Sequence, residues 1–476
     1  MGKKIEFKGS ISESIDEVQL TIPKDVDVGW KFWKKRRNVV GLLVFLGFFM
    51  SNSLRVNLSI AVVVMTTSTG NVKPEFDWNS DLRGVILGSF FYGYTATQFL
   101  GGYLSSKIGG KKVLGVGIGA TALLTLTTPL LTRTSVYLLI FLRIVMGLFE
   151  GVTFPSTNSI WANWAPPTER SKLSTLPFSG STAGAVIAMP LSSIIAARLG
   201  WPAIFYINGL MGLIWFAAWM YFISDTPRDD PWISVSELEY LEKTLCKIEN
   251  NKKNISHPWK EMLTSVPVWA IFVAHFCGMW GYHTMVMQLP LFIENVLHFE
   301  IEKTGFVSAL PYLGLTIVMV LSGHIADYLL SNNYLSTTMV RKTLTCASFI
   351  GQTIFMTLTG FMSTSVAVIL CIIISFSIDG LSTPGYVVNY LDIAPQRASI
   401  LLGMGKTIAT LPGIISPTVT GYIVKNKTAE EWRIVFMIVS IIYLFGAIIY
   451  GTFASSKKQK WADESYDRTK INDNIL

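Results

Sequence analysis

Charged residues are scarce in this chain of 476 amino acids. Asp, Glu, Lys and Arg make up 15% of it and hydrophobic residues 50%, whereas a soluble domain carries about 25% charged residues. So much apolar surface excludes a soluble enzyme and a disordered protein. The four cysteines have no disulfide or metal-ligand spacing, and the five histidines form no cluster. We therefore expect no disulfide scaffold, metal site, cofactor or membrane enzyme.

Long apolar runs recur between Asn38 and Ser455. A membrane span needs about 20 apolar residues, and a spanning chain must satisfy its own backbone hydrogen bonds, which favours helices. The first 37 residues are polar and lack the apolar core of a signal peptide, so we expect the first span to direct insertion. Twelve helical spans are predicted, near residues 38–66, 83–106, 111–131, 135–162, 171–198, 201–224, 267–297, 304–328, 341–362, 364–390, 397–424 and 431–455.

Most lysines and arginines fall on one predicted side of the membrane. They occupy the first 37 residues, the 225–266 stretch, the tail after Ser455 and the short loops on the same predicted side as these segments. Because cytosolic loops carry the excess of Lys and Arg, both termini and the middle loop are predicted to be cytosolic. The net charge of +8 lies in tails and loops, so nucleic acid is not expected as a partner.

The two halves of the chain resemble each other. Gly102 to Ser106 and Gly323 to Asp327 share the form G-x-x-x-(D/S), each followed by basic residues after a span. Similar halves around a midplane site are typical of secondary transporters. We predict an all-α membrane protein with twelve transmembrane helices in two pseudo-symmetric six-helix bundles. Its segments are a cytosolic N-terminal tail (1–37), an N-terminal bundle (38–224), a cytosolic linker (225–266), a C-terminal bundle (267–455) and a cytosolic C-terminal tail (456–476). The linker has helical spacing and is interpreted as a solvated amphipathic helix rather than a partner site.

Charges inside spans are the sharpest functional signal, because each costs at least about 2.5–3.5 kcal/mol to insert. Arg55 lies near the middle of the first span, and its forked guanidinium suits a carboxylate or phosphate. Arg143 and Glu150 share the fourth span, nearly two turns or about 10 Å apart. They face the same way but are too far apart to pair directly. Burial penalises a charged carboxyl group, so Glu150 is a candidate for proton coupling; a structural role beside an arginine is the alternative.

Four further residues are weaker candidates. Asp379 and Lys406 fall at similar depths on the tenth and eleventh spans, which predicts an interhelical charge pair; a substrate or ion site is the alternative. Tyr94 and Gln98 are four residues apart in the second span. They form a polar stripe that lines a cavity or packs against another helix.

Several motifs together resemble a known group of transporters. They are LRVNLS (54–59), GSFFYGY (88–94), GVTFP (151–155), WAPPTERS (164–171) and LDIAP (391–395). Through them the chain, from about Asn38 to Trp461, is similar to the anion:cation symporters of the major facilitator superfamily. This is solute carrier family 17, which includes sialin, the vesicular glutamate transporters and sodium-dependent phosphate cotransporter-like proteins. The resemblance implies two rocking bundles, with Arg55 and Arg143 on the substrate anion and Glu150 in proton coupling.

The departures from the family concern the substrate. Leu87 and Gly278 stand where vesicular glutamate transporters carry histidine and arginine, which speaks against that subfamily. Met146 replaces a second glutamate of sialin, which puts sialin-like proton coupling in question. Asp379 and Lys406 match no motif of either group. Neither tail has an acidic dileucine signal, so lysosomal sorting is not predicted, and plasma, endolysosomal and vesicular membranes all stay open.

The function predicted from the sequence is cation-coupled symport of a small anion, organic or inorganic phosphate, by alternating access. Arg55, Arg143, Tyr94 and Gln98 would contact the anion, and Glu150 or a sodium site would couple it to a proton or sodium gradient. A proton-coupled, sialin-like transporter of acidic sugars or amino acids is the alternative. A transporter-like sensor and an anion channel are different classes with the same spans. The expected partners are a small anion and the lipid bilayer, and the expected state is a monomer.

Overall fold

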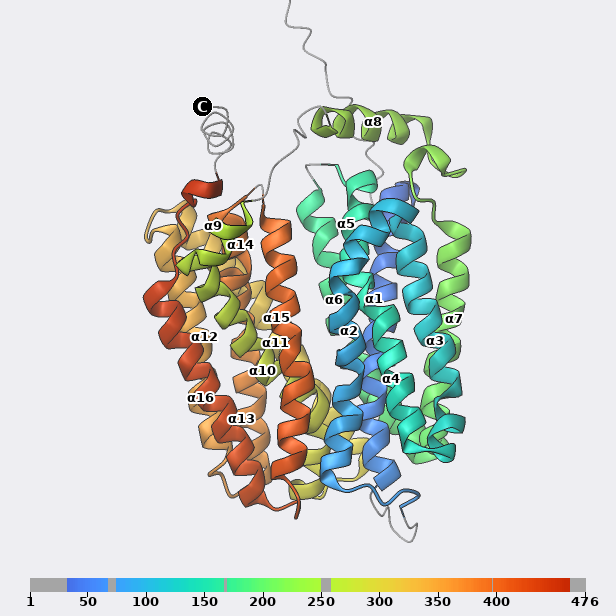
Figure 1. Ribbon diagram of the computed structural model, residues 1–476, viewed down its shortest axis with the longest axis vertical. Coiled ribbons are helices and arrows are strands. Elements are labelled where there is room, and N and C mark those ends of the chain that lie inside the picture. Colours follow the sequence, from blue (N-terminus) through green and yellow to red (C-terminus); the bar gives the residue numbers. More distant parts are fainter. Residues whose placement is uncertain (1–31, 67–73, 167–168, 250–257, 396, 463–476) are drawn as a thin grey trace, which may run out of the picture.

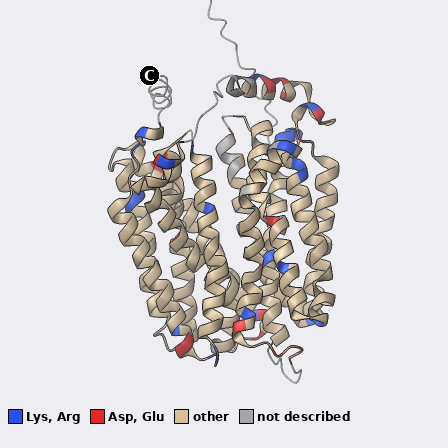
Figure 2. Ribbon diagram, viewed as in Figure 1, with Lys and Arg blue, Asp and Glu red and all other residues tan. Residues whose placement is uncertain are grey.

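The computed structural model describes residues 32–66, 74–166, 169–249, 258–395 and 397–462, and within these ranges every regular element is a helix. Most of both predicted tails lies outside the described residues. The helices run roughly parallel and form two groups, one in cool and one in warm colours (Figure 1). Charged residues gather at the two ends, and the helix middles carry few of them (Figure 2).

The first group contains six spans. It is built from α1 (Arg36–Thr66), α2 (Ser80–Ile108), α3 (Gly110–Thr134), α4 (Val136–Gly151), α5 (Thr153–Trp164), α6 (Arg170–Leu199) and α7 (Trp201–Phe222). The fourth span comprises α4 and α5, which meet at Val152. Helix α1 packs on α6, α2 on α4, and α3 on α7.

The second group contains the other six spans. They are α10 (Val266–Phe292), α11 (Ile301–Ser331), α12 (Thr337–Thr359), α13 with α14 (Ser365–Ile378 and Val388–Ile393), α15 (Ala398–Ile423) and α16 (Ala429–Phe453). Two short helices, α8 (Val235–Glu249) and α9 (Trp259–Thr264), connect the groups. Helix α12 packs on α16, α10 on α15, and α11 on α13.

Nine spans of the described chain are long and apolar enough to cross a membrane by length and composition. The other three, α2, α10 and α12, have similar lengths but fall outside that set. Helix α2 contacts α4 and α15, and α10 contacts α15, α16 and α1.

The two groups approach most closely at the end opposite α8. Their contacts are made by α2 with α15, α6 with α11, and α1 with α10. At the end away from α8, Gly84 lies against Pro417 and Gly421 lies against Ser80. Neither glycine has room for a Cβ atom. At the α8 end, Gly102 of α2 has no neighbouring atom within 4 Å of the place a Cβ would take. The groups are thus closed against each other at the end away from α8.

The linker between the two groups is docked on the first group. Helix α8 lies across the end of the first group (Figure 1). The Glu237 carboxylate accepts hydrogen bonds from the Arg36 backbone N–H at 2.8 Å and from Arg37 Nη1 at 3.2 Å. Arg36 pairs with Asp230 at 2.9 Å, and both of these side chains are buried. The basic run before the first span therefore anchors the linker to the first group.

Candidate functional site

An ion pair joins Arg55 of α1 to Glu150 at the end of α4. Arg55 Nη2 donates to Glu150 Oε1, and the Ser51 hydroxyl donates to the same oxygen at 2.6 Å. Glu150 is fully buried, whereas 14% of the Arg55 side chain is exposed. Glu150 Oε2 and Arg55 Nε find no hydrogen-bond partner among the described residues. The pair therefore keeps free hydrogen-bonding capacity on both of its members.

Arg143 is the second buried guanidinium of this region. It is 1% exposed, and its Nη2 donates to the backbone carbonyl of Arg55 at 3.4 Å. No carboxylate of the described chain forms an ion pair with it, and its Nε lacks a partner. Two guanidinium groups thus lie near one carboxylate, Glu150, which pairs with Arg55 only. Among these three side chains positive charge exceeds negative charge.

Aromatic rings of α2 make cation–π contacts with both guanidinium groups. The Arg55 guanidinium lies 5.0 Å from the ring centre of Phe90 and 4.8 Å from that of Tyr94. The Arg143 guanidinium lies 5.0 Å from the ring centre of Phe90. Such contacts offset part of the cost of burying a cation. Gln98 is also buried, but its amide makes no hydrogen bond to a described residue.

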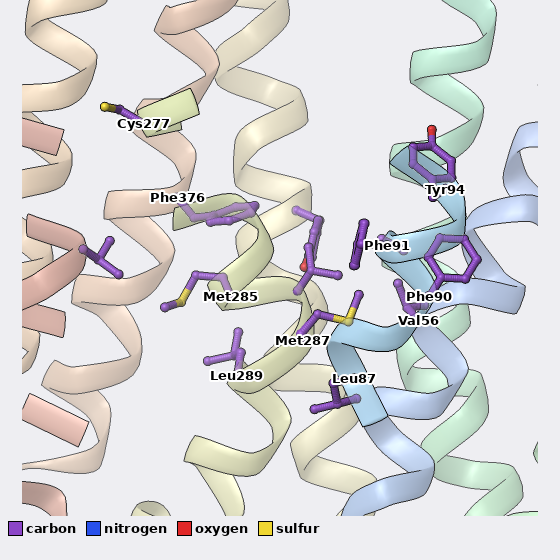
Figure 3. Close-up of a cluster of buried hydrophobic side chains, with 14 of the residues drawn as sticks. Val56, Leu87, Phe90, Phe91, Tyr94, Cys277, Met285, Met287, Leu289 and Phe376 are labelled. Carbon is purple, nitrogen blue, oxygen red and sulfur yellow. The ribbon is translucent and has the colours of Figure 1, made fainter. Parts of the chain in front are cut away.

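An apolar cluster lies between α2 and α10 beside the arginines. Figure 3 shows Phe91 and Phe90 of α2 on one side and Met285, Met287 and Leu289 of α10 on the other. Phe91 also contacts His283, with ring centres 4.6 Å apart. This cluster forms part of the packing between the two groups, next to the arginines.

The two weaker charges do not form the predicted pair. Lys406 Nζ lies over the rings of Phe154 and Phe178, 4.0 and 4.6 Å from their centres. Asp379 instead accepts a hydrogen bond from Gln352 Nε2 at 3.2 Å. Lys406 therefore points across to the first group, while Asp379 points into the second.

Sequence reasoning missed the neutral partners of these charges. Ser51 lies one helical turn before Arg55, a spacing that could have indicated a shared partner. Gln352, Phe154 and Phe178 come from other helices, and no spacing in the sequence relates them to Asp379 or Lys406. Within the described chain, no group of three or more His, Cys, Asp or Glu residues could hold a metal ion.

Two six-helix groups around a buried, charged centre define a secondary transporter. The sequence matches the Major Facilitator Superfamily over residues 38–417, and the chain belongs to this superfamily. Solved structures agree in fold. A bacterial homolog of the human lysosomal transporter Spinster, in an inward-facing and unoccupied conformation, aligns with a TM-score of 0.70 at 13% identity, covering 89% of this chain and 99% of that one. A D-xylose-proton symporter aligns with a TM-score of 0.64 at 15% identity, covering 88% and 99%.

Curated relatives place the chain among the anion transporters of solute carrier family 17. It is 40% identical to vesicular glutamate transporter 2.2 of Danio rerio over 91% of this chain and 76% of that protein. It is also 40% identical to human sialin, over 89% and 90% of the two chains. The chain is thus a secondary transporter of anions, not an enzyme, and a multi-pass membrane protein. Overall identity does not separate the glutamate transporters from sialin.

Proposed function

We propose that this transporter binds a small anion at Arg143 and Arg55 and carries it by cation-coupled symport. The observation that supports this most is Arg143, a buried guanidinium with no carboxylate partner in the described chain. A buried cation is costly unless it is paired, and a substrate carboxylate or phosphate would supply the missing charge. Guanidinium groups bind both anions through paired N–H donors.

Glu150 could give up Arg55 to an arriving anion. It neutralises Arg55 in the empty site, and an arriving anion could take over that arginine. Loss of the Arg55 bond would leave Glu150 buried and charged, which favours uptake of a proton. Anion binding and protonation of Glu150 would then support each other. Tyr94 and Gln98 on the same face of α2 are proposed to contact the anion beside the arginines.

The direction of access follows from the packing of the two groups. They are closed at the end away from α8, so we propose that the anion reaches the site from the α8 end. By the distribution of Lys and Arg, this is the cytosolic side. The structure would then represent an inward-facing state of a monomer with both termini in the cytosol.

Two substrate classes fit this site. Inorganic phosphate or an organic anion with sodium coupling is the first proposal. The relatives named for glutamate transport, together with sialin, support the alternative, a proton-coupled carrier of acidic sugars or amino acids. A sensor would bind an anion without net flux, and a channel would pass it without accumulation.

Uptake into proteoliposomes distinguishes these proposed functions. Labelled phosphate, sialic acid, glutamate and urate would be offered while sodium and proton gradients are imposed independently. We expect Arg143→Gln to raise the KM about 10–100-fold, because a hydrogen bond to a charged group contributes about 1.5–3 kcal/mol. Arg133→Gln is the matched control, since Arg133 is about half exposed and pairs with Glu75 at the end of α3.

Each result has a distinct meaning. Proton-driven uptake that is lost in Glu150→Gln supports carboxylate coupling. Sodium-driven uptake that survives Glu150→Gln supports a separate cation site. Uptake that Arg143→Gln and Arg133→Gln affect equally would contradict the proposed anion site. Tagged protein in cells would distinguish the plasma membrane from endolysosomal or vesicular membranes.

A further inference from the structure

The tenth span is interrupted inside the second group. Helix α13 ends at Ile378, a 3-10 turn covers Asp379–Ser382, a π turn covers Thr383–Val387, and α14 resumes at Val388. Gly385 has φ −80° and ψ −108°, outside the helical region. Side chains of other helices donate to carbonyls at this break: Ser322 to that of Gly380 at 2.9 Å and Arg341 to that of Pro384 at 2.8 Å. In transporters, unwound carbonyls of broken helices coordinate coupling ions.

Asp379 is the first residue of this break and carries a charge without a cationic partner. No Lys or Arg of the described chain forms an ion pair with it; its contacts are Gln352 Nε2 at 3.2 Å and the Ser382 hydroxyl. Both contacts are neutral. Asp379 as a residue is partly buried. A carboxylate in a membrane helix normally faces a cation, a proton or an ion pathway.

Gln352 supplies a second oxygen at the same place. Its side chain is fully buried, and its Oε1 has no hydrogen-bond donor in the described chain. Its Nε2 is shared between Asp379 and the Ser348 hydroxyl, at 3.2 and 3.0 Å. A half-turn of the terminal amide would exchange nitrogen for oxygen and present Oε1 to Asp379. Two oxygens that both lack a positive partner would then face one another.

We propose that a sodium ion binds between the Asp379 carboxylate and the Gln352 amide oxygen. The Ser382 hydroxyl, which already contacts the Asp379 carboxylate, would be a third ligand. A site made only of oxygens suits a hard cation, and one carboxylate balances one positive charge. The ion takes the place that the sequence alone had given to Lys406. Its role as the coupling ion rests on the transport function proposed above, whereas its binding does not.

Sodium binding is testable without a substrate. The full chain, purified in detergent, would be melted in sodium chloride and in choline chloride at constant ionic strength and pH. A ligand that binds only the folded state raises the melting temperature. We expect sodium to stabilise the wild type and Asp327→Asn, which removes an exposed carboxylate of the same group. Asp379→Asn should abolish the effect, and Gln352→Leu should raise the half-saturating sodium concentration about tenfold or more.

The outcomes that overturn the site are equally definite. Either a wild type that sodium does not stabilise, or an Asp379→Asn protein that keeps the full sodium effect, would refute it. If Asp379→Asn fails to fold, Gln352→Leu decides: an unchanged sodium response refutes the site, and a weakened response supports it.

Transport separates this proposal from the proposed function. In proteoliposomes supplied with labelled phosphate, Asp379→Asn should lose sodium-driven accumulation but keep exchange of labelled for unlabelled phosphate. Arg143→Gln should weaken both, in line with its raised KM. Sodium binding in detergent without phosphate transport would refute only the substrate assignment. Phosphate transport driven by sodium in Asp379→Asn would refute the coupling role of the site.

Discussion

The closest approach of α2 and α4 makes Gly147 a sensitive point of the anion site. A Cβ atom on Gly147 would lie 2.8 Å from the backbone nitrogen of Tyr94 and closer still to the carbonyl oxygen of Phe90. Ordinary contacts begin at 3.4 Å. Because both neighbours are backbone atoms, no side chain can turn aside. In Gly147→Ala, the two helices must separate by a substantial fraction of an ångström.

Two losses follow from this separation. Overpacking costs about 1–3 kcal/mol of stability, which a lower melting temperature in detergent would report. Phe90 and Tyr94 would also move away from Arg55, whose guanidinium lies over both rings. Each such contact contributes about 0.5–2 kcal/mol. We therefore expect weaker anion affinity, with a KM raised about threefold to thirtyfold, since 1.4 kcal/mol is a factor of ten.

Gly102→Ala is the matched control on the same helix. Nothing lies within 4 Å of the place its Cβ would take, and replacing a glycine in a helix by alanine stabilises it by about 0.5–1 kcal/mol. The two variants should therefore change the melting temperature in opposite directions. If Gly147→Ala matched Gly102→Ala in both melting temperature and uptake, the argument from close packing would be wrong.

Two further predictions concern the ends of the molecule. Glu237→Gln leaves Arg37 with less counter-charge in a buried site, where breaking a pair costs about 3–5 kcal/mol; thermal melting should show a large loss, and the exposed Glu239→Gln should show little. At the opposite end, hydrogen bonding to Arg133 holds the pKa of Glu75 below its usual 4.5. A lowered pKa stabilises the fold above the unfolded value, and this contribution is lost as the pH falls below about 4.5. Since the pair is about half exposed, it contributes about 0.2–1 kcal/mol. Melting from pH 7 to pH 3 should therefore show a slightly smaller acid effect in Glu75→Gln, and an identical pH profile would contradict it.

The sequence alone determined the architecture. It also singled out the buried charges that need a physical explanation. Spans are visible because transfer of a residue into lipid depends mainly on that residue and its near neighbours. The same local cost singled out Arg55, Arg143, Glu150, Asp379 and Lys406. The seven-residue spacing of Arg143 and Glu150 also excluded a direct pair, because both lie on one regular helix.

Tertiary structure decided which group each charge meets. Depth along the membrane suggested that Asp379 pairs with Lys406, but depth does not fix the direction in which a side chain leaves its helix. The tenth span breaks at Asp379, which turns this carboxylate toward Gln352, and Lys406 turns toward rings of the other group. Glu150 and Arg55 come from α4 and α1, which lie far apart in the sequence, and meet only in the folded first group. Partner choice depends on helix rotation and packing in three dimensions, which spacing along a single chain does not specify.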